Sequence, residues 1–339
     1  MAEQRALDVG PSRMTVAYEC FGADHDPPVL LVMGGGAQMI AWPEGFCAEL
    51  VRRGLRVIRF DNRDAGRSSH FPDLPVPDLQ AALDHRFPAV PYTLSDLADD
   101  ITGLLDVLRL DSVHLVGASL GGMIAQTVAV EHPERVRSLT SMMSTTGDPA
   151  VGRSDPTALT VLGTPPQDRR HFIAWQLRAL RAVASPGFAF DEAAVVQRAE
   201  RAYDRGHDPA GMVRQFAAAM ASGDRTAQLR TLRVPALVIH GTDDVMIGAS
   251  GGRATAAAVP GAELALIDGM GHSLPDALWP QLATLIARLV HRVEAAAGAG
   301  VAYGAPAAGA ETVYGAPAAD VKAVYDAPTA GDRAPAHGR

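Results

Sequence analysis

Lysine is almost absent from this chain. Among 339 residues there is a single lysine, Lys322, although lysine and arginine together number 30. Lys322 lies close to the C-terminus, so no lysine in the body of the chain is available to form a Schiff base or to complete a phosphate-binding P-loop. The sequence therefore excludes enzymes that depend on either of these chemistries.

Cysteine and aromatic residues are also scarce. The two cysteines, Cys20 and Cys47, form no CxxC pair and match no zinc-ligand spacing. We therefore expect reduced, partly buried thiols and no disulfide scaffold. Aromatic residues make up 5% of the chain, which leaves aliphatic residues and methionine to fill most of the core.

Long apolar runs are missing as well. No uninterrupted apolar run reaches the roughly 18 residues of a spanning helix, and the N-terminal sequence MAEQRALDVGPSRM has no apolar signal-peptide region. We expect no membrane partner and a cytoplasmic location, with export without a leader as the alternative. The net charge of −8 gives no basic surface for nucleic acid or for an anionic membrane.

Short apolar segments alternate with amphipathic ones in the first part of the chain. Thr93, followed three residues later by Asp96, is close to a helix capping box. Such alternation favours an α/β fold with a mostly parallel sheet and helices on both faces. The predicted strands are 14–21, 29–33, 56–60, 113–117 and 136–143, and the predicted helices are 46–53, 93–109 and 120–132.

The middle of the chain interrupts this pattern. Residues from about 147 to 228 show Arg- and Ala-rich helical patterns, such as 171–184 and 191–204, and no strand pattern. We therefore predict an α/β core formed by two separate segments, with a helical cap inserted between them. The core segments are 1–146 and 229–296, the cap is 147–228, and the second core segment has strands at 235–241 and 263–269 and helices at 249–258 and 278–296.

Residues 297–339 differ from the rest in composition. They are rich in Ala, Gly and Pro, and Tyr303, Tyr314 and Tyr325 recur every 11 residues in AYGAPAA, VYGAPAA and VYDAPTA. Three copies with so little apolar bulk cannot bury a core, so we predict a disordered tail. The alternative is a repeat that docks on a partner, which the sequence does not identify, and a homo-oligomer is compatible with either interpretation.

The segment GASLG at 117–121 fits the pattern G-x-S-x-G and lies between an apolar strand and a helix. In that context Ser119 occupies a tight turn with its hydroxyl above the sheet, and Gly117 and Gly121 remove side chains that would collide. The N-terminus of the following helix favours a developing oxyanion, with the Leu120 N–H as one donor. We predict that Ser119 is a catalytic nucleophile.

Three successive glycines follow the predicted strand 29–33. Glycine lets the backbone approach a substrate closely, so this loop is expected to supply a second oxyanion donor. Gly35 is the predicted donor, with Gly34 and Gly36 as alternatives. A dinucleotide-binding fingerprint is the competing interpretation, but it requires a third glycine where Met39 stands.

The chain has 11 histidines, and their order in the sequence selects among them. In proteins whose nucleophile stands in a G-x-S-x-G turn between a strand and a helix, the acid and then the histidine follow the nucleophile along the chain. His272 lies in GMGHSLP, a glycine-rich loop after a predicted strand, from which an imidazole can reach a distant serine. His240 lies within a strand, where burial is expected. His291 lies in the last helix, where a solvated or capping role is expected. We predict His272 as the general base.

The acid is expected directly after the strand 235–241, in the segment HGTDDVMI. A carboxylate there would hold the imidazole in the required tautomer and stabilise the imidazolium. Asp244 is the predicted acid because it stands three residues after the glycine, and Asp243 is expected to point away or to cap the turn. Asp148, after an earlier strand, is a weaker alternative.

Several large apolar residues lie close to predicted strand ends and active-site loops. Methionine suits irregular apolar surfaces, so these residues are candidates for a substrate pocket, with ordinary core packing as the alternative. The candidates are Met33, Met39, Trp42, Met142 and Met143.

The segments LLVMGGG, RFDNRDAGRSS, LVGASLGG, LVIHGTDD and GMGHSLP resemble the successive signatures of α/β-hydrolase esterases. The resemblance covers roughly 14–146 and 229–292, and it is strongest to the branch that holds bacterial carboxylesterases and aclacinomycin methylesterase. It implies the α/β-hydrolase fold and a cap over the active site. It also implies a triad of Ser119, Asp244 and His272, with oxyanion donors Leu120 and Gly35.

The chain departs from this family pattern at two positions. Met33-Gly34 stands where many relatives have His-Gly, which raises the question of how the oxyanion loop is held. Arg63-Asp64 stands where many relatives have Arg-Gly, in a turn to which we assign a structural role. The residues expected to tie loops together there are Asp61, Arg63 and Arg67.

These features predict a serine hydrolase that cleaves a small or medium carboxylic ester through an acyl-enzyme, with no metal and no organic cofactor. Hydrolysis of C–C bonds or lactones, and peracid formation as in non-haem haloperoxidases, are alternatives that use the same triad. A ligand-binding receptor or an assembly protein built on the fold is an alternative of another class. The fold by itself does not decide among them.

Overall fold

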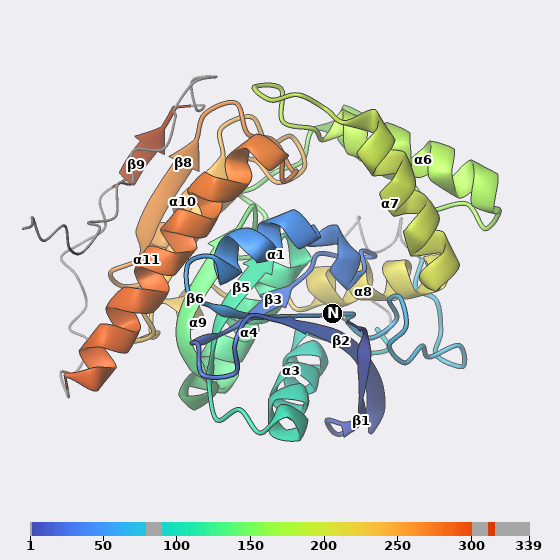
Figure 1. Ribbon diagram of the computed structural model, residues 1–339. Coiled ribbons are helices and arrows are strands. Elements are labelled where there is room, and N and C mark those ends of the chain that lie inside the picture. The colour runs from blue at the N-terminus through green and yellow to red at the C-terminus, as the bar shows by residue number, and fades with distance from the viewer. Residues whose placement is uncertain (1, 79–89, 300–310, 316–339) are drawn as a thin grey trace, which may run out of the picture.

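The structure, a computed structural model, describes residues 2–78, 90–299 and 311–315 (Figure 1). Within these residues nine strands form one sheet in the order β1-β2-β4-β3-β5-β6-β7-β8-β9. The pairs β1–β2 and β2–β4 are antiparallel and all other pairs are parallel. The strands are β1 (Gln4–Val9), β2 (Met14–Phe21), β3 (Pro28–Val32), β4 (Arg56–Phe60), β5 (Val113–Ala118), β6 (Val136–Met142), β7 (Ala236–Gly241), β8 (Glu263–Ile267) and β9 (Glu311–Tyr314).

Helices cover both faces of this sheet, as the alternating pattern predicts. Helices α1 (Glu44–Val51) and α11 (Trp279–Gly298) pack on one face, and α3 (Leu94–Leu108), α4 (Leu120–Glu131) and α10 (Ser250–Ala258) pack on the other. Successive strand residues point to opposite faces, so β3 and β4 contribute apolar side chains to both cores, and β3 is apolar throughout. Among the residues described, no helix is both long enough and apolar enough to cross a bilayer.

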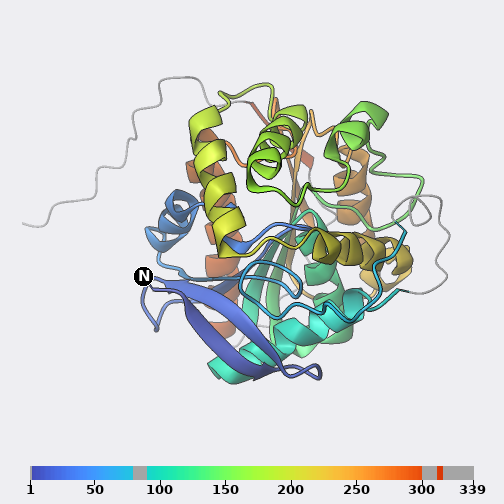
Figure 2. The same ribbon diagram turned by 90° about the vertical axis from the view of Figure 1, so that its right-hand side faces the viewer.

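Five further helices lie between β6 and β7 in sequence: α5 (Pro156–Leu162), α6 (Arg169–Ala182), α7 (Glu192–Arg205), α8 (Pro209–Ala221) and α9 (Thr226–Leu229). Helices α6 and α7 pack together above the carboxyl ends of the parallel strands (Figures 1 and 2). Aspartates Asp168, Asp191 and Asp208 begin α6, α7 and α8, and each side chain accepts a backbone N–H three residues later. An aspartate side chain thus caps the N-terminus of each of these three helices. The helices lie in the segment that was predicted to be a helical insertion because its sequence shows no strand pattern.

The edges of the sheet differ from the prediction. The strand β1 was not predicted, and the prediction of a disordered tail is wrong for Glu311–Tyr314, which form β9 beside β8. The Asp268 N–H donates to the Tyr314 carbonyl at 2.9 Å, and Tyr314 packs against the core on the α11 side. The other two repeat tyrosines, Tyr303 and Tyr325, lie outside the described residues.

Candidate active site

Ser119 stands at the sharp turn between β5 and α4. Its backbone has φ 57° and ψ −124°, a region that residues other than glycine adopt rarely and at a cost of about 1–3 kcal/mol. The turn is held from both sides, because the Ser119 N–H donates to the Met142 carbonyl (2.9 Å) and the Ser144 hydroxyl donates to the Ser119 carbonyl (2.8 Å). The side chain of Ser119 therefore sits at the carboxyl edge of the sheet, on the wall of a cavity.

The glycines around Ser119 permit this turn to pack closely. A Cβ on Gly117 would lie 2.2 Å from the Gly121 carbonyl oxygen, and a Cβ on Gly121 would lie 2.1 Å from the Val32 carbonyl oxygen. Both distances are far below normal contact. Any larger residue at either position would push α4 away from β3 and β5 and displace Ser119.

His272 is bonded to a buried carboxylate. Its Nδ1 lies 2.8 Å from Asp244 Oδ2, while Asp244 Oδ1 accepts the N–H groups of Met246 (2.9 Å) and Ile247 (2.8 Å). Burial raises the pKa of Asp244, but the neighbouring imidazoles of His272 and His240 outweigh it, so the pKa lies well below its usual value. An ionised carboxylate on Nδ1 leaves Nε2 of His272 as the proton acceptor.

The alternative acids and bases occupy other environments. His240 is fully buried in β7, with Nε2 2.7 Å from a backbone carbonyl and 3.5 Å from Asp244 Oδ2. His291 contacts a backbone carbonyl on the surface at 2.8 Å. Asp243 and Asp148 accept hydrogen bonds within their own loops or from the loop before His272, and neither lines the cavity that contains Ser119.

The loop that carries His272 is held by the chain just after cap helix α6. The His272 N–H donates to the Val183 carbonyl (2.9 Å), and the Gly271 N–H donates to the Ser185 hydroxyl (2.9 Å). A Cβ on Gly271 would lie 2.3 Å from the Ala184 carbonyl oxygen. The cap therefore does more than cover the site, since it also positions the histidine loop.

The glycine loop after β3 passes directly beside Ser119. A Cβ on Gly34 would lie 3.6 Å from Ser119 Oγ. The Gly36 N–H donates to Oε1 of Gln215, from cap helix α8, at 2.7 Å. The Gly36 N–H is therefore already hydrogen-bonded. The N–H groups of Gly34 and Gly35 remain as the candidate oxyanion donors beside the serine hydroxyl.

Amide side chains that the sequence reasoning missed hold this loop. The Asn62 amide donates to the Met33 carbonyl at 3.0 Å. The Gln38 amide donates to the carbonyls of Ala202 (2.6 Å) and Gly206 (2.7 Å) at the end of α7. Together with the contact from Gln215, these hydrogen bonds hold the glycine loop in place. Asn62 stands within the quoted turn signature, but no local signal marks either glutamine.

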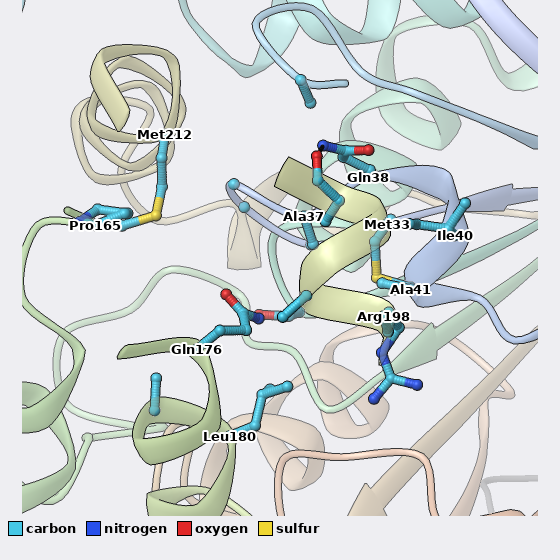
Figure 3. A pocket seen from close by; sticks show the side chains of 18 of the residues that line it. Met33, Ala37, Gln38, Ile40, Ala41, Pro165, Gln176, Leu180, Arg198 and Met212 are labelled. Carbon is cyan, nitrogen blue, oxygen red and sulfur yellow. Dashed lines mark hydrogen bonds between the residues drawn. The ribbon is translucent and has the colours of Figure 1, made fainter. Parts of the chain in front are cut away.

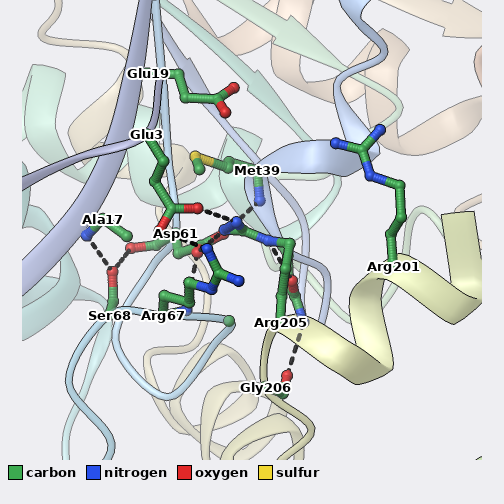
Figure 4. A network of polar contacts seen from close by, with 12 residues as sticks. Glu3, Ala17, Glu19, Met39, Asp61, Arg67, Ser68, Arg201, Arg205 and Gly206 are labelled. Atoms are coloured by element: carbon green, nitrogen blue, oxygen red, sulfur yellow. Dashed lines mark hydrogen bonds and ion pairs between the residues drawn. The ribbon is translucent and has the colours of Figure 1, made fainter. Parts of the chain in front are cut away.

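Asp61 joins three parts of the molecule in the polar network of Figure 4. Its fully buried carboxylate accepts the N–H groups of Met39 (2.7 Å) and Arg67 (3.0 Å) and pairs with Arg205, the last residue of α7. Arg205 also pairs with Glu3 ahead of β1. The turn was predicted to hold neighbouring loops together, and Asp61 does so. Its charged partner, Arg205, belongs to the helical cap.

The neighbouring residues Arg63 and Asp64 make buried ion pairs. Arg63 pairs with Asp100 of α3 at 2.6 Å, and Asp64 pairs with Arg214 of α8 at 2.8 Å. Asp64 has φ 62°, the left-handed conformation that glycine adopts most easily. The ion pair of the Asp64 carboxylate with Arg214 in the cap thus offsets the free-energy cost of this backbone conformation.

One cluster among the described residues has the composition of a metal site. Asp64, His70 and Asp208 place ligand atoms within 4.8 Å of one another. The guanidinium of Arg214 already donates to both Asp64 oxygens and lies 3.2 Å from Asp208. A cationic side chain therefore occupies the position that a metal would need, and the cluster is an ionic contact between core and cap.

A cavity of about 310 Å³ lies between the core and the cap (Figure 3). Ser119, His272 and the glycine loop line it from the core side. Of the five predicted pocket residues, Met33 and Met143 line it, but Met39, Trp42 and Met142 are fully buried in the core and do not. The cap contributes Phe172, Gln176, Leu180, Val195, Arg198 and Met212.

Comparison with known families agrees with this arrangement of strand, elbow and cap. Residues 27–276 match the family described as the alpha/beta hydrolase fold. The chain belongs to this family. The predicted fold and the predicted resemblance to its esterases are confirmed.

Among its relatives, rhodomycin D methylesterase of Streptomyces peucetius is 29% identical over 302 residues, which is 81% of this chain and 97% of that protein. A putative carbamate hydrolase of Variovorax paradoxus is 35% identical over 126 residues, covering 37% of this chain and 41% of that protein. The crystal structure of a hydrolase from Pseudomonas aeruginosa superposes with a TM-score of 0.62 at 26% identity, covering 86% of this chain and 98% of that one. This chain is thus similar to several hydrolases.

Proposed function

We propose that this α/β hydrolase is a serine esterase that cleaves a small or medium carboxylic ester through an acyl-enzyme. The observation that carries the proposal is that Ser119 and His272 line one cavity, while His272 is bonded to the buried, ionised Asp244. A serine, an imidazole and an orienting carboxylate are the groups that acyl transfer requires.

In this mechanism His272 Nε2 takes the Ser119 proton as Oγ attacks the ester carbonyl. Asp244 stabilises the imidazolium that forms, and the N–H groups of Leu120 and Gly35 bind the developing oxyanion. His272 then protonates the leaving alcohol. A water molecule, activated by the same imidazole, releases the acid from Ser119.

Two features support an ester as the substrate. The methylesterase relative matches over most of both chains, whereas the carbamate hydrolase relative matches over a shorter segment. The cavity is walled mainly by apolar side chains, such as Met33, Phe172 and Leu180, which suits an uncharged acyl or alcohol group.

The test is hydrolysis of 4-nitrophenyl esters of increasing acyl length by the wild-type protein and by Ser119→Ala. We expect kcat/KM to depend on acyl length and to fall by about 10³-fold or more in Ser119→Ala. Ser95→Ala, which removes an exposed hydroxyl on α3, serves as the matched control. Equal activity of Ser119→Ala and wild type would overturn the proposal. A lactone and a carbamate tested in parallel decide between reactions of the same triad.

A further inference from the structure

Arg198 of helix α7 lines the cavity that contains Ser119 and His272. Among the described residues that line this cavity, it is the one Lys or Arg side chain. Figure 3 shows its guanidinium extended away from α7, in the same view as Met33, Ala41 and Leu180, which line the cavity with it. A cation in a mainly apolar cavity calls for an explanation.

The neighbouring cap arginines have partners. Arg205 pairs with Asp61 and Glu3, and Arg214 pairs with Asp64 and Asp208. These contacts account for the two charges as anchors that hold the cap on the core.

Arg198 has no such partner within the part of the chain that the structure describes, where neither an ion pair nor a hydrogen bond to protein is found. The Asp191 carboxylate makes no ion pair or hydrogen bond with Arg198, because it caps α7 by accepting the Ala194 N–H at 2.9 Å. Its negative charge influences the pKa of Arg198 from a greater distance. Burial lowers the pKa of Arg198, against the opposing charge of Asp191, yet a guanidinium stays cationic at neutral pH. The half-buried side chain therefore carries an uncompensated charge.

Arg198 also lies at a junction. A second hollow, of about 410 Å³, adjoins the catalytic cavity and shares Leu180, Arg198 and Leu274 with it. Arg198 therefore lies on the boundary between the two cavities, where a substrate that extends from one into the other can contact its guanidinium. A planar, delocalised cation of this kind binds a carboxylate through two parallel hydrogen bonds.

We propose that Arg198 binds a free carboxylate carried by the substrate at some distance from the ester bond. The preferred substrates are then half-esters of dicarboxylic acids, or esters whose alcohol part bears a carboxyl group. Arg59 and Arg201 also line the second hollow, but Arg59 pairs with Glu19 and Arg201 pairs with Glu44. The one unpaired guanidinium among the described lining residues, that of Arg198, matches a monoanionic carboxylate, whereas a phosphate dianion would call for more positive charge. This inference rests on the proposed esterase function and specifies its substrate class.

The kinetic test compares two substrates that differ only in the distal charge. They are the mono-4-nitrophenyl ester of adipic or suberic acid and the same compound with its free carboxyl group methylated. We expect the wild type to favour the free acid for at least one chain length, and Arg198→Met to lower the acid-to-methyl ratio of kcat/KM by about tenfold or more. Arg198→Lys should restore part of the ratio, and Arg178→Met, an exposed arginine on α6, should leave it unchanged.

A ratio below one at every chain length in the wild type, or a ratio that Arg198→Met leaves unchanged, would overturn the Arg198 proposal while the esterase function stands. The effect is also measurable without turnover. Calorimetry with Ser119→Ala should show tighter binding of ethyl hydrogen suberate than of diethyl suberate, and the preference should vanish when Arg198→Met is added. If neither nitrophenyl ester is cleaved but this preference is found, the esterase function fails and the carboxylate site remains. No preference in either assay contradicts the site itself.

Discussion

In the proposed mechanism Asp244 acts only as long as its carboxylate is ionised and bonded to His272. The Asp244→Asn variant keeps the size of the side chain but no longer stabilises the imidazolium. We expect it to lower kcat by about 10³–10⁴-fold. The result is to be read together with a circular dichroism spectrum, because an unfolded variant would also be inactive. A folded variant with activity within about threefold of wild type would remove Asp244 from the mechanism.

The pH dependence follows from the same pair. The pKa of Asp244 lies below its usual value because the contacts with His272 and His240 outweigh the effect of burial. Asp244 therefore stays ionised as pH falls from neutral, so its own protonation should add no step to the acid limb of kcat/KM. A profile of kcat/KM between pH 4 and 9 is the measurement. An acid limb with a slope of two would indicate a second titrating group.

Gln215 offers a prediction about positioning rather than chemistry. Its Oε1 accepts the Gly36 N–H at 2.7 Å, and its amide donates to the Arg63 carbonyl at 2.6 Å. Gln215→Leu leaves both groups unpaired, so we expect a loss of about 1–3 kcal/mol in the free energy of unfolding. A loosened oxyanion loop should also lower kcat more than it changes KM. Gln228→Leu, an exposed glutamine in α9, is the control and should match wild type in both measurements.

Residue identities near the chemistry were predictable where a short pattern carries them. G-x-S-x-G singled out Ser119 and the glycine-rich loop singled out His272 as candidates, and the structure places both on the wall of one cavity. Met39, Trp42 and Met142 were assigned wrongly because closeness to a strand end in sequence does not tell which way a side chain points. Gln38 and Gln215 act across 164 and 179 residues, and no local pattern reports such a contact.

At the level of elements, helix α8 is the part of the cap most firmly attached to the core. The Arg214–Asp64 pair is buried on both sides, so Arg214→Met leaves a buried carboxylate without its main partner. We expect this variant to lower the free energy of unfolding by about 3–5 kcal/mol. Arg178→Met removes an exposed cap charge and should change it by less than about 0.5 kcal/mol. Equal denaturant midpoints for the two variants would contradict this role of Arg214.

The same pair makes stability depend on pH. Burial raises the pKa of Asp64, but Arg214, the Phe71 N–H and the Tyr92 hydroxyl outweigh it, so the folded-state pKa lies below the unfolded value of about 3.9. The folded state then binds fewer protons, and this stabilisation is present above about pH 4 and lost as pH falls through the folded pKa. The thermal midpoint of wild type should therefore fall more steeply below pH 4 than that of Asp64→Asn. Parallel curves would show that another group is responsible.

The boundaries of strands and helices were predictable where one face or both faces of the element are buried, because burial leaves an apolar pattern in the sequence. Strands β2 and β4 match the predicted ranges 14–21 and 56–60, and Thr93 forms the capping box of α3 with Asp96. The edge strands β1 and β9 were missed because most of their side chains are exposed, so neither shows an apolar pattern. Their strand structure comes from pairing with a neighbour, which a local pattern does not report.

For the whole molecule, β9 closes the sheet beside β8. A chain that ends at Gly298 lacks β9 and leaves the edge of β8 that faces away from β7 unpaired, whereas a chain that ends at Gly315 keeps β9. We expect the shorter chain to have a lower thermal midpoint and a greater tendency to self-associate through the exposed edge. Light scattering and thermal denaturation of the two truncated chains measure this. Indistinguishable behaviour would show that β9 does not protect the edge.

The most direct test of the account is covalent capture of Ser119, the proposed nucleophile. A diethyl phosphoryl ester such as paraoxon reacts with an activated serine and forms a stable adduct, which intact-mass and peptide mass spectrometry can locate. The account predicts one adduct per chain, on the peptide that contains Ser119, and loss of esterase activity in proportion to labelling. Labelling should be lost in Ser119→Ala and strongly slowed in Asp244→Asn. Inactivation without modification of Ser119, or labelling that persists in Ser119→Ala at the same rate, would contradict the account.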